Sequence, residues 1–185
     1  MAKGVDANYR FISASQELTA RITQRQQALA LYVTLIVSLL AALVALKTSP
    51  ASNNVPVEWL VLGFPVASLC FVFLHYKAER AITNLRQFMS ELERIDDTHK
   101  SLPSYNTHPQ WSVTANKARR FHDYAGIVLV AGGNATGLGA ALGIYPARFA
   151  EQPITLWLSI AIGAVSVIGL LINPLWSYAP PARDD

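Results

Sequence analysis

Charge is absent from four long stretches of this sequence. Only 15% of the residues are Asp, Glu, Lys or Arg and 52% are apolar, whereas soluble domains typically carry about 25% charge. The stretches that contain none of these four residue types are 28–46, 59–76, 124–145 and 154–173. A soluble helical bundle is disfavoured, because its helices usually interrupt the apolar stripe with charge at every third or fourth position.

Each stretch is long enough for one membrane crossing. The four are 18 to 22 residues long, and a helix that rises 1.5 Å per residue needs roughly 20 residues to cross a hydrocarbon core of about 30 Å. The sequence therefore predicts an all-α membrane protein with four transmembrane helices and cytoplasmic helical extensions.

Several chemical signatures are also missing. Cys70 is the single cysteine, so an intramolecular disulfide is excluded, and we expect it to be a small, buried apolar side chain. No Asp, Glu, His, Lys or Arg lies in the middle of a span, although ion-coupled transporters usually keep one there. Nucleophile elbows, phosphate-binding glycine loops and zinc-finger spacings are lacking. We therefore expect no enzyme activity, no catalytic residue, no cofactor and no nucleic-acid partner.

The remaining positive charge predicts the orientation. Of the fifteen Lys and Arg residues, thirteen lie in 1–27, 77–123 and 174–185. Only Lys47 and Arg148 lie in the two short connecting segments, 47–58 and 146–153. Because cytoplasmic loops are enriched in Lys and Arg, both termini and the long loop are predicted to be cytoplasmic. The expected location is the cell inner membrane, with the lipid bilayer as the first partner.

The chain divides into nine predicted segments. They are a cytoplasmic N-terminal helix (1–27), the first span (28–46), a short outer loop (47–58), the second span (59–76), a cytoplasmic helical loop (77–123), the third span (124–145), a second outer loop (146–153), the fourth span (154–173) and a cytoplasmic tail (174–185). Apolar residues that recur every three or four positions after the second span predict a helical seam, formed by Ala78, Ala81, Leu85, Phe88, Leu92 and Ile95. This seam suits packing within the chain, packing between subunits or a cytoplasmic protein partner that binds through 78–100.

Small residues in the last two spans predict close helix packing. The third span contains the pairs Gly133/Gly137 and Gly139/Gly143, and Ser159/Gly163 repeats the spacing in the fourth. Such pairs let helix backbones approach closely, within one chain or in a homo-oligomer or other membrane assembly. Asn134 and Thr136 are polar residues deep in the third span, and we expect either an inter-helix hydrogen bond or a pore lining from them.

Four ionisable residues lie near the predicted inner boundary. His75 and Glu79 are one helical turn apart, and His122 and Asp123 precede the third span. If the second and third spans are neighbours, these side chains converge as a weak candidate metal site, because imidazole and carboxylate groups are common zinc and iron ligands. The more frequent alternative is a set of interfacial polar groups that bind no metal.

A polar helix enters the first span over Arg10–Leu46, and the second span ends in Tyr76-Lys77-Ala78-Glu79-Arg80 before the seam. In this arrangement the first half of the chain resembles the SLATT family of small bacterial membrane proteins. That resemblance implies an association with nucleotide-sensing conflict systems and antiviral defence, a pore-forming effector role and no catalytic residues. The second pair of spans departs from the family pattern.

The sequence thus favours a non-enzymatic oligomeric inner-membrane protein, either a membrane-permeabilising effector or an accessory subunit of a membrane assembly. A small channel or transporter with a path along the glycine-rich third span is the alternative. A membrane enzyme or metal site at the inner boundary is the third hypothesis.

Overall fold

The computed structural model describes residues 6–48, 56–95 and 105–176, which form helices and short turns without strands. The four long helices are α1 (Ala7–Thr48), α2 (Val57–Glu93), α4 (Pro109–Ile144) and α6 (Pro153–Ile172), and the short elements are α5 (Pro146–Glu151) and the 3₁₀ helix η3 (Asn173–Trp176). All four long helices are apolar and long enough to cross a membrane. The prediction of an all-helical chain with four such helices is confirmed.

Some predicted segments fall outside the described residues. These are part of the N-terminal segment (1–5), most of the first outer loop (49–55), part of the long loop (96–104), which includes the end of the proposed partner-binding segment 78–100, and most of the tail (177–185).

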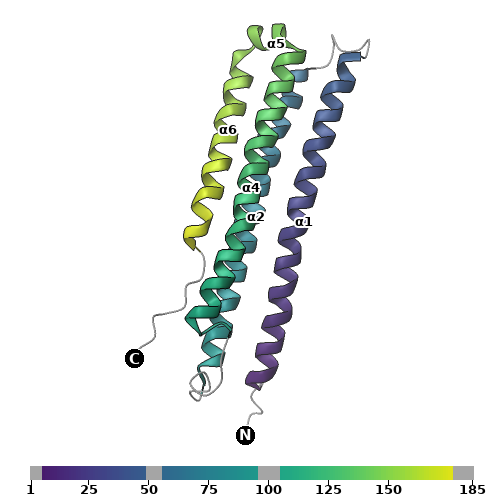
Figure 1. Ribbon diagram of the computed structural model, residues 1–185. Helices are drawn as coiled ribbons and strands as arrows, with labels where there is room; N and C mark the ends of the chain where they lie inside the picture. Colours follow the sequence, from purple (N-terminus) through teal and green to yellow (C-terminus); the bar gives the residue numbers. More distant parts are fainter. Residues whose placement is uncertain (1–5, 49–55, 96–104, 177–185) are drawn as a thin grey trace.

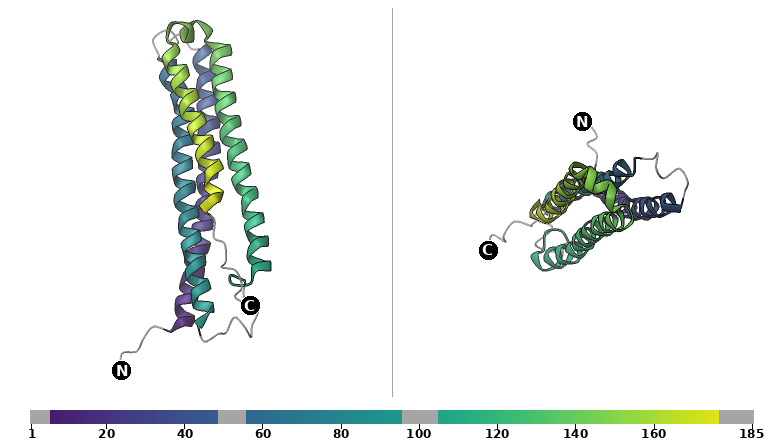
Figure 2. Two further views of the ribbon diagram at one scale, coloured as in Figure 1. Left: turned by 90° about the vertical axis from the view of Figure 1, so that its left-hand side faces the viewer. Right: turned by 90° about the horizontal axis from the view of Figure 1, so that it is seen from above.

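The long helices run alternately up and down in one elongated bundle (Figure 1). α2 and α4 lie between α1 and α6, and contacts connect α2 to all three other long helices. At 1.5 Å per residue α1 is about 63 Å long, while α6 is about 30 Å. All four helices therefore run side by side over the level of the charge-free stretches, and we call this part of the bundle the apolar belt. Of the helices in the described part of the chain, only α1, α2 and α4 continue beyond it, and we call their extensions the polar end (Figure 2).

Two clusters of side chains fill the interior of the belt. Tyr32 of α1 stacks on Phe71 of α2 with ring centroids 5.0 Å apart, at the centre of the cluster nearer the polar end. The second cluster, near the far end, consists of Leu43, Val57, Val61, Ala141 and Phe149. Phe149 belongs to α5, so the predicted loop 146–153 is largely a short helix that closes this end of the bundle.

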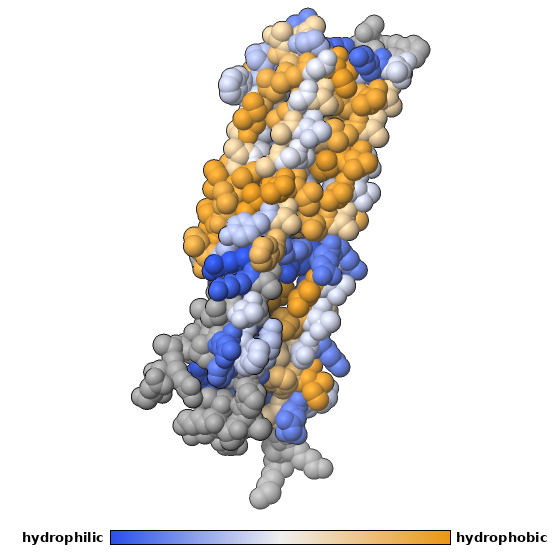
Figure 3. Space-filling model, in the orientation of Figure 1, coloured by the Kyte–Doolittle hydropathy of each residue, from blue (hydrophilic) through white to orange (hydrophobic). Residues whose placement is uncertain are grey.

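Most apolar surface of the belt faces outward. Only 17% of the most apolar window of α1 is buried within the chain, against 44% for α2 and 22% each for α4 and α6. Figure 3 shows this surface as a continuous apolar zone above a hydrophilic band. Such an extensive exposed apolar surface is unusual for a protein in water and is compatible with a multi-pass membrane protein.

Proline occurs at an interior position of one long helix, α2, and in the first turn of another, α4. α2 continues through Pro65, which lies inside the buried core of the belt. α4 begins with Pro109 in its first turn, where the missing N–H leaves no helical hydrogen bond unmade. The extension of α4 is therefore helical from its first turn into the belt.

Candidate functional site: a buried charge cluster

The helix termini of the belt bring ionisable residues to one level. Arg25 precedes the first charge-free stretch on α1, Glu79 follows the second on α2, and Asp123 precedes the third on α4. Because neighbouring helices are antiparallel, these positions meet where the apolar belt ends. We call the buried or half-buried set Arg25, His75, Glu79, Arg86, Arg119, His122 and Asp123 the charge cluster.

Glu79 is the centre of the charge cluster. Its Oε2 accepts a hydrogen bond from Arg25 Nη1 at 2.8 Å, and its Oε1 lies 2.5 Å from Arg119 Nη2. The Glu79 side chain is 2% exposed, and the two arginines are 8% and 10% exposed. One carboxylate of α2 thus binds α1 and α4 at the same time.

His75 and Asp123 form the second pair of the charge cluster. His75 Nε2 lies 2.9 Å from Asp123 Oδ1, so α2 is connected to α4 a second time. The His75 ring also lies 5.6 Å from the ring of Phe71 and 5.6 Å from the ring of His122, centroid to centroid. These contacts fix the imidazole between the aromatic core of the belt and the polar end.

Burial governs the electrostatics of this region. His122 lies outside the charge-free stretches, and its pKa is lowered from the ordinary 6.5 to about 4 because burial disfavours the charged ring, with added repulsion from Arg25 and His75. Burial also lowers the pKa of the Arg119 guanidinium, although the Glu79 carboxylate acts in the opposite direction. At neutral pH the His122 ring is therefore uncharged, whereas Glu79 and its two arginine partners form ion pairs nearby.

The four candidate metal ligands are neighbours but not a common coordination sphere. His75 and Asp123 contact each other, whereas Glu79 faces the two arginines. Within the described part of the chain, no group of three or more His, Cys, Asp or Glu side chains has the geometry to hold a metal ion. Two contacting ligands are fewer than the three or four protein ligands of typical zinc sites.

Asn134 belongs to a hydrogen-bonded group inside the belt. Its Nδ2 donates to Ser68 Oγ of α2 at 2.7 Å and to the carbonyl of Val130 at 2.8 Å, and Tyr32 Oη of α1 lies 3.1 Å from the same Ser68 oxygen. Three helices thus share one buried hydroxyl. Thr136, the other polar residue singled out in this span, is exposed on the outside of α4.

The glycines of α4 divide into two rows. A β-carbon on Gly133 would lie 2.9 Å from Tyr32 Oη, and one on Gly137 would lie 2.6 Å from the Phe64 ring, so this pair permits close packing on α1 and α2. By contrast, β-carbons on Gly132, Gly139 and Gly143 would meet nothing within 4 Å. We call these three the outer glycine row. Of the two predicted pairs, the first packs inside the chain and the second faces outward.

The predicted pair on α6 faces the interior. Ser159 and Gly163 are buried, and a β-carbon on Gly163 would lie 3.3 Å from the Asn134 side chain. The hydroxyl of Ser159 donates to the carbonyl of Thr155 in its own helix. α6 therefore packs against the polar group of α4 without donating to it.

The helical seam of α2 is rotated from its expected orientation. Ala78 is buried, and Ala81, Leu85 and Leu92 are half-buried, but Phe88 and Ile95 are 41% and 46% exposed. Ile82 and Met89 are buried in their place. The physical reason is that Glu79 and Arg86 face the interior of the bundle. This rotation of the helix places Phe88 and Ile95 at its surface.

Arg25, Arg86 and Arg119 are the members of the charge cluster that sequence reasoning missed. Counting Lys and Arg for topology treats every one of them as a solvated charge. A usable signal is the position of Arg25, which lies three residues after Ile22 and four before Leu29 and so shares one helix face with two apolar side chains. Ile22 is 38% exposed, and Arg25 is buried at 7%.

Comparisons of the chain with protein-family models, curated proteins and solved structures find no match. The class that the fold defines is a bundle of four membrane-length helices, and a buried charge cluster links three of them where the belt ends.

Proposed function

We propose that this chain is a non-enzymatic, oligomeric four-pass protein of a bacterial inner membrane, with both termini and the polar end in the cytoplasm. The apolar belt supports the membrane location. The excess of Lys and Arg in the segments at the polar end, thirteen against two, supports the orientation.

The outer glycine row carries the proposal of an oligomer. Each glycine in a helix interior costs about 1 kcal/mol relative to alanine, and β-carbons on Gly132, Gly139 and Gly143 would meet nothing in the described chain within 4 Å, so packing within the chain does not require glycine there. Spaced by seven and four residues, they lie on one face of α4. A second copy of the chain can approach this face backbone to backbone, which is how membrane helices associate without a hydrophobic driving force.

The charge cluster supports a non-enzymatic role. A catalytic acid or base must reach the reacting group of a substrate, but Glu79 is held between two guanidinium groups and His75 is paired with Asp123, all of them buried. We infer that the cluster fixes α1, α2 and α4 relative to one another at the membrane boundary.

Within this class we favour an effector that permeabilises the inner membrane over an accessory subunit. α1, α2 and α4 run unbroken from the polar end into the belt, so a cytoplasmic protein bound along the α2 extension, within 78–100, acts directly on three spans. Induced expression with a membrane-potential dye tests this role. Loss of the membrane potential is expected. If cells keep both their membrane potential and their growth under every trigger that is tried, the effector role is refuted.

The oligomer is tested by native mass measurement from lipid nanodiscs. Wild-type protein is expected as a multimer, and Gly139→Leu should shift it toward monomer, because a leucine side chain separates the helices by its own width. Ala164→Leu, at an exposed position of α6, is the matched control and should leave the multimer intact. A monomeric wild type, or equal effects of the two substitutions, would contradict the proposal.

A further inference from the structure

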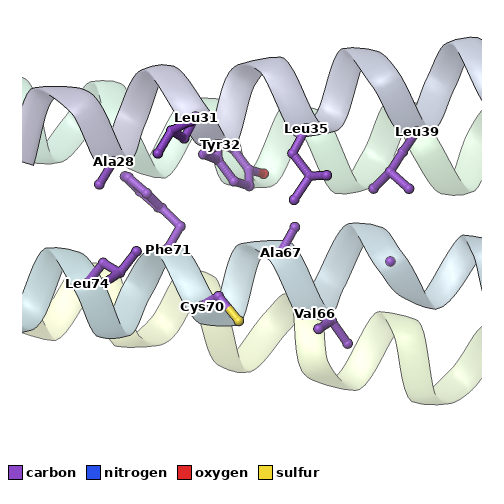
Figure 4. Close-up of a pocket in the computed structure, with 11 residues that line it drawn as sticks. Ala28, Leu31, Tyr32, Leu35, Leu39, Val66, Ala67, Cys70, Phe71 and Leu74 are labelled. Atoms are coloured by element: carbon purple, nitrogen blue, oxygen red, sulfur yellow. The ribbon is translucent and has the colours of Figure 1, made fainter.

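The bundle contains a groove between α1 and α2 that runs along the outside of the apolar belt (Figure 4). Its volume is about 370 Å³, and every lining side chain except Tyr32 and Cys70 is a hydrocarbon. The floor includes the buried residues Tyr32, Ala67 and Phe71, whereas the rims include Leu31 and Val66, which are 70% and 49% exposed. The groove is therefore open to the surroundings of the bundle rather than enclosed.

Small residues explain why this space is empty. Ala28 on α1 and Ala67 and Gly63 on α2 face it with little side chain, while Tyr32 and Phe71 stack on each other along its floor. Leu39 covers Gly63 at the far end, with its Cδ2 3.1 Å from the position of a β-carbon on that glycine. The groove thus has an apolar end inside the belt.

The length of the groove matches one leaflet. From Ala28 to Leu39 the helix rises about 16 Å, roughly half of a hydrocarbon core of about 30 Å. Ala28 lies at the start of the first charge-free stretch, so the groove occupies the half of the belt next to the polar end. An acyl chain from the leaflet at the polar end fits this span.

Basic side chains lie at the end of the groove that is nearer the polar end. A second, smaller hollow of about 90 Å³ shares Ala28 and Leu74 with the groove and is also lined by Arg21 and Lys77. Lys77 is exposed, and the pair of Arg21 with Glu17 is an exposed i,i+4 pair with side chains 32% and 48% accessible. Exposed pairs of this kind contribute little, so an anionic group can compete for the guanidinium.

We propose that this α1–α2 groove binds one phospholipid with an anionic headgroup, its acyl chain along Ala67 and its headgroup at Arg21 and Lys77. The inference rests on the proposed orientation, which places the polar end at the inner leaflet. Apolar fit selects a lipid, and the two basic residues select negative charge, since each Lys or Arg near an anionic surface contributes favourably.

Native mass spectrometry of the detergent-solubilised protein tests the headgroup. Titration with phosphatidylglycerol is expected to give one lipid per chain, bound about tenfold more tightly than phosphatidylcholine with the same acyl chains. The variant R21Q/K77Q should lose this preference, and Lys117→Gln, at an exposed position of α4, should keep it. Equal binding of both lipids by wild type, or a preference that survives R21Q/K77Q or falls equally in Lys117→Gln, would overturn the proposal.

Cys70 gives a second test of the groove, in which the decisive change is made to the folded wild-type protein. The sequence-based expectation of a buried Cys70 is wrong, because the side chain is exposed and lines the groove, and it is the single cysteine of the sequence. A bulky maleimide attached to Cys70 of the folded protein should abolish the bound lipid, while Cys70→Ala treated in the same way should retain it. Lipid that persists after labelling would contradict the groove as its site. The same mass spectra also give the number of protomers. A monomer that binds the lipid would contradict only the proposed oligomer. A multimer without a preference for the anionic lipid would contradict only the lipid site.

Discussion

Arg25 and Glu79, 54 positions apart in the sequence, form an ion pair of 2.8 Å with side chains only 8% and 2% exposed. Burying charges costs several kcal/mol for each ion, and this cost is offset only when the geometry is good and further partners are present. Arg119 supplies that further partner on the other carboxylate oxygen. Removing one member of this pair therefore leaves the other as an uncompensated buried charge.

Glu79→Gln is expected to lower the free energy of unfolding in detergent by about 3–5 kcal/mol, because it leaves buried guanidinium groups uncompensated. Chemical unfolding followed by circular dichroism measures this loss. Glu91→Gln, at an exposed position of the same helix, is the control and should change stability by no more than about 0.5 kcal/mol. Similar values for the two variants would show that the charge cluster contributes nothing to stability.

Gly137→Ala and Gly139→Ala should differ in their effect, although the two positions are two residues apart. The first places a methyl group 2.6 Å from the Phe64 ring and is expected to cost about 1–3 kcal/mol through overpacking. The second meets nothing within 4 Å and should leave the free energy of unfolding of the monomer unchanged or slightly raised. Thermal unfolding of both variants in detergent is the measurement, and an equal loss would contradict the division into two glycine rows.

Acid should destabilise the fold in part through His122. Its pKa is about 4 in the folded chain and near 6.5 when unfolded, so between these values the unfolded state binds the proton that the folded state excludes. Stability is consequently lost as pH falls from about 6.5 toward 4. His122→Gln removes this contribution, and its unfolding free energy should decline less steeply over that interval than that of wild type. Parallel pH profiles for the two proteins would be evidence against a neutral, buried His122.

Asn134→Leu distinguishes a packing role from a pore lining. The substitution removes the hydrogen bond to Ser68 and should lower stability by about 1 kcal/mol. Under the proposed function, conductance in planar bilayers should stay at the wild-type value. A clear change in conductance would instead favour the channel hypothesis, with its path along α4.

The apolar helices were predictable from the sequence because the lack of charge over 18 to 22 residues is a strong one-dimensional signal. The proximity of His75 and Asp123 also followed once the second and third spans were assumed to be neighbours. The partners of Glu79 did not follow, since a list of basic residues does not distinguish Arg25, which is buried, from Arg21, which is half-exposed. Nor does the spacing of glycines reveal that Gly137 faces Phe64 while Gly139 faces outward, because the direction of each face is set by tertiary packing.

The difference in length between α1 and α6 has a mechanical consequence. A helix without a break resists bending, so α1, which contains no internal proline or glycine, would transmit a displacement as a stiff rod. Within the described residues, α6 ends near the level of the charge cluster and only the four residues of η3 follow it (Figure 1). A sideways displacement of the polar end would therefore act on α1 and, through the ion pairs of Glu79, on α2 and α4, whereas α6 would receive it only through its packing against α2 and α4.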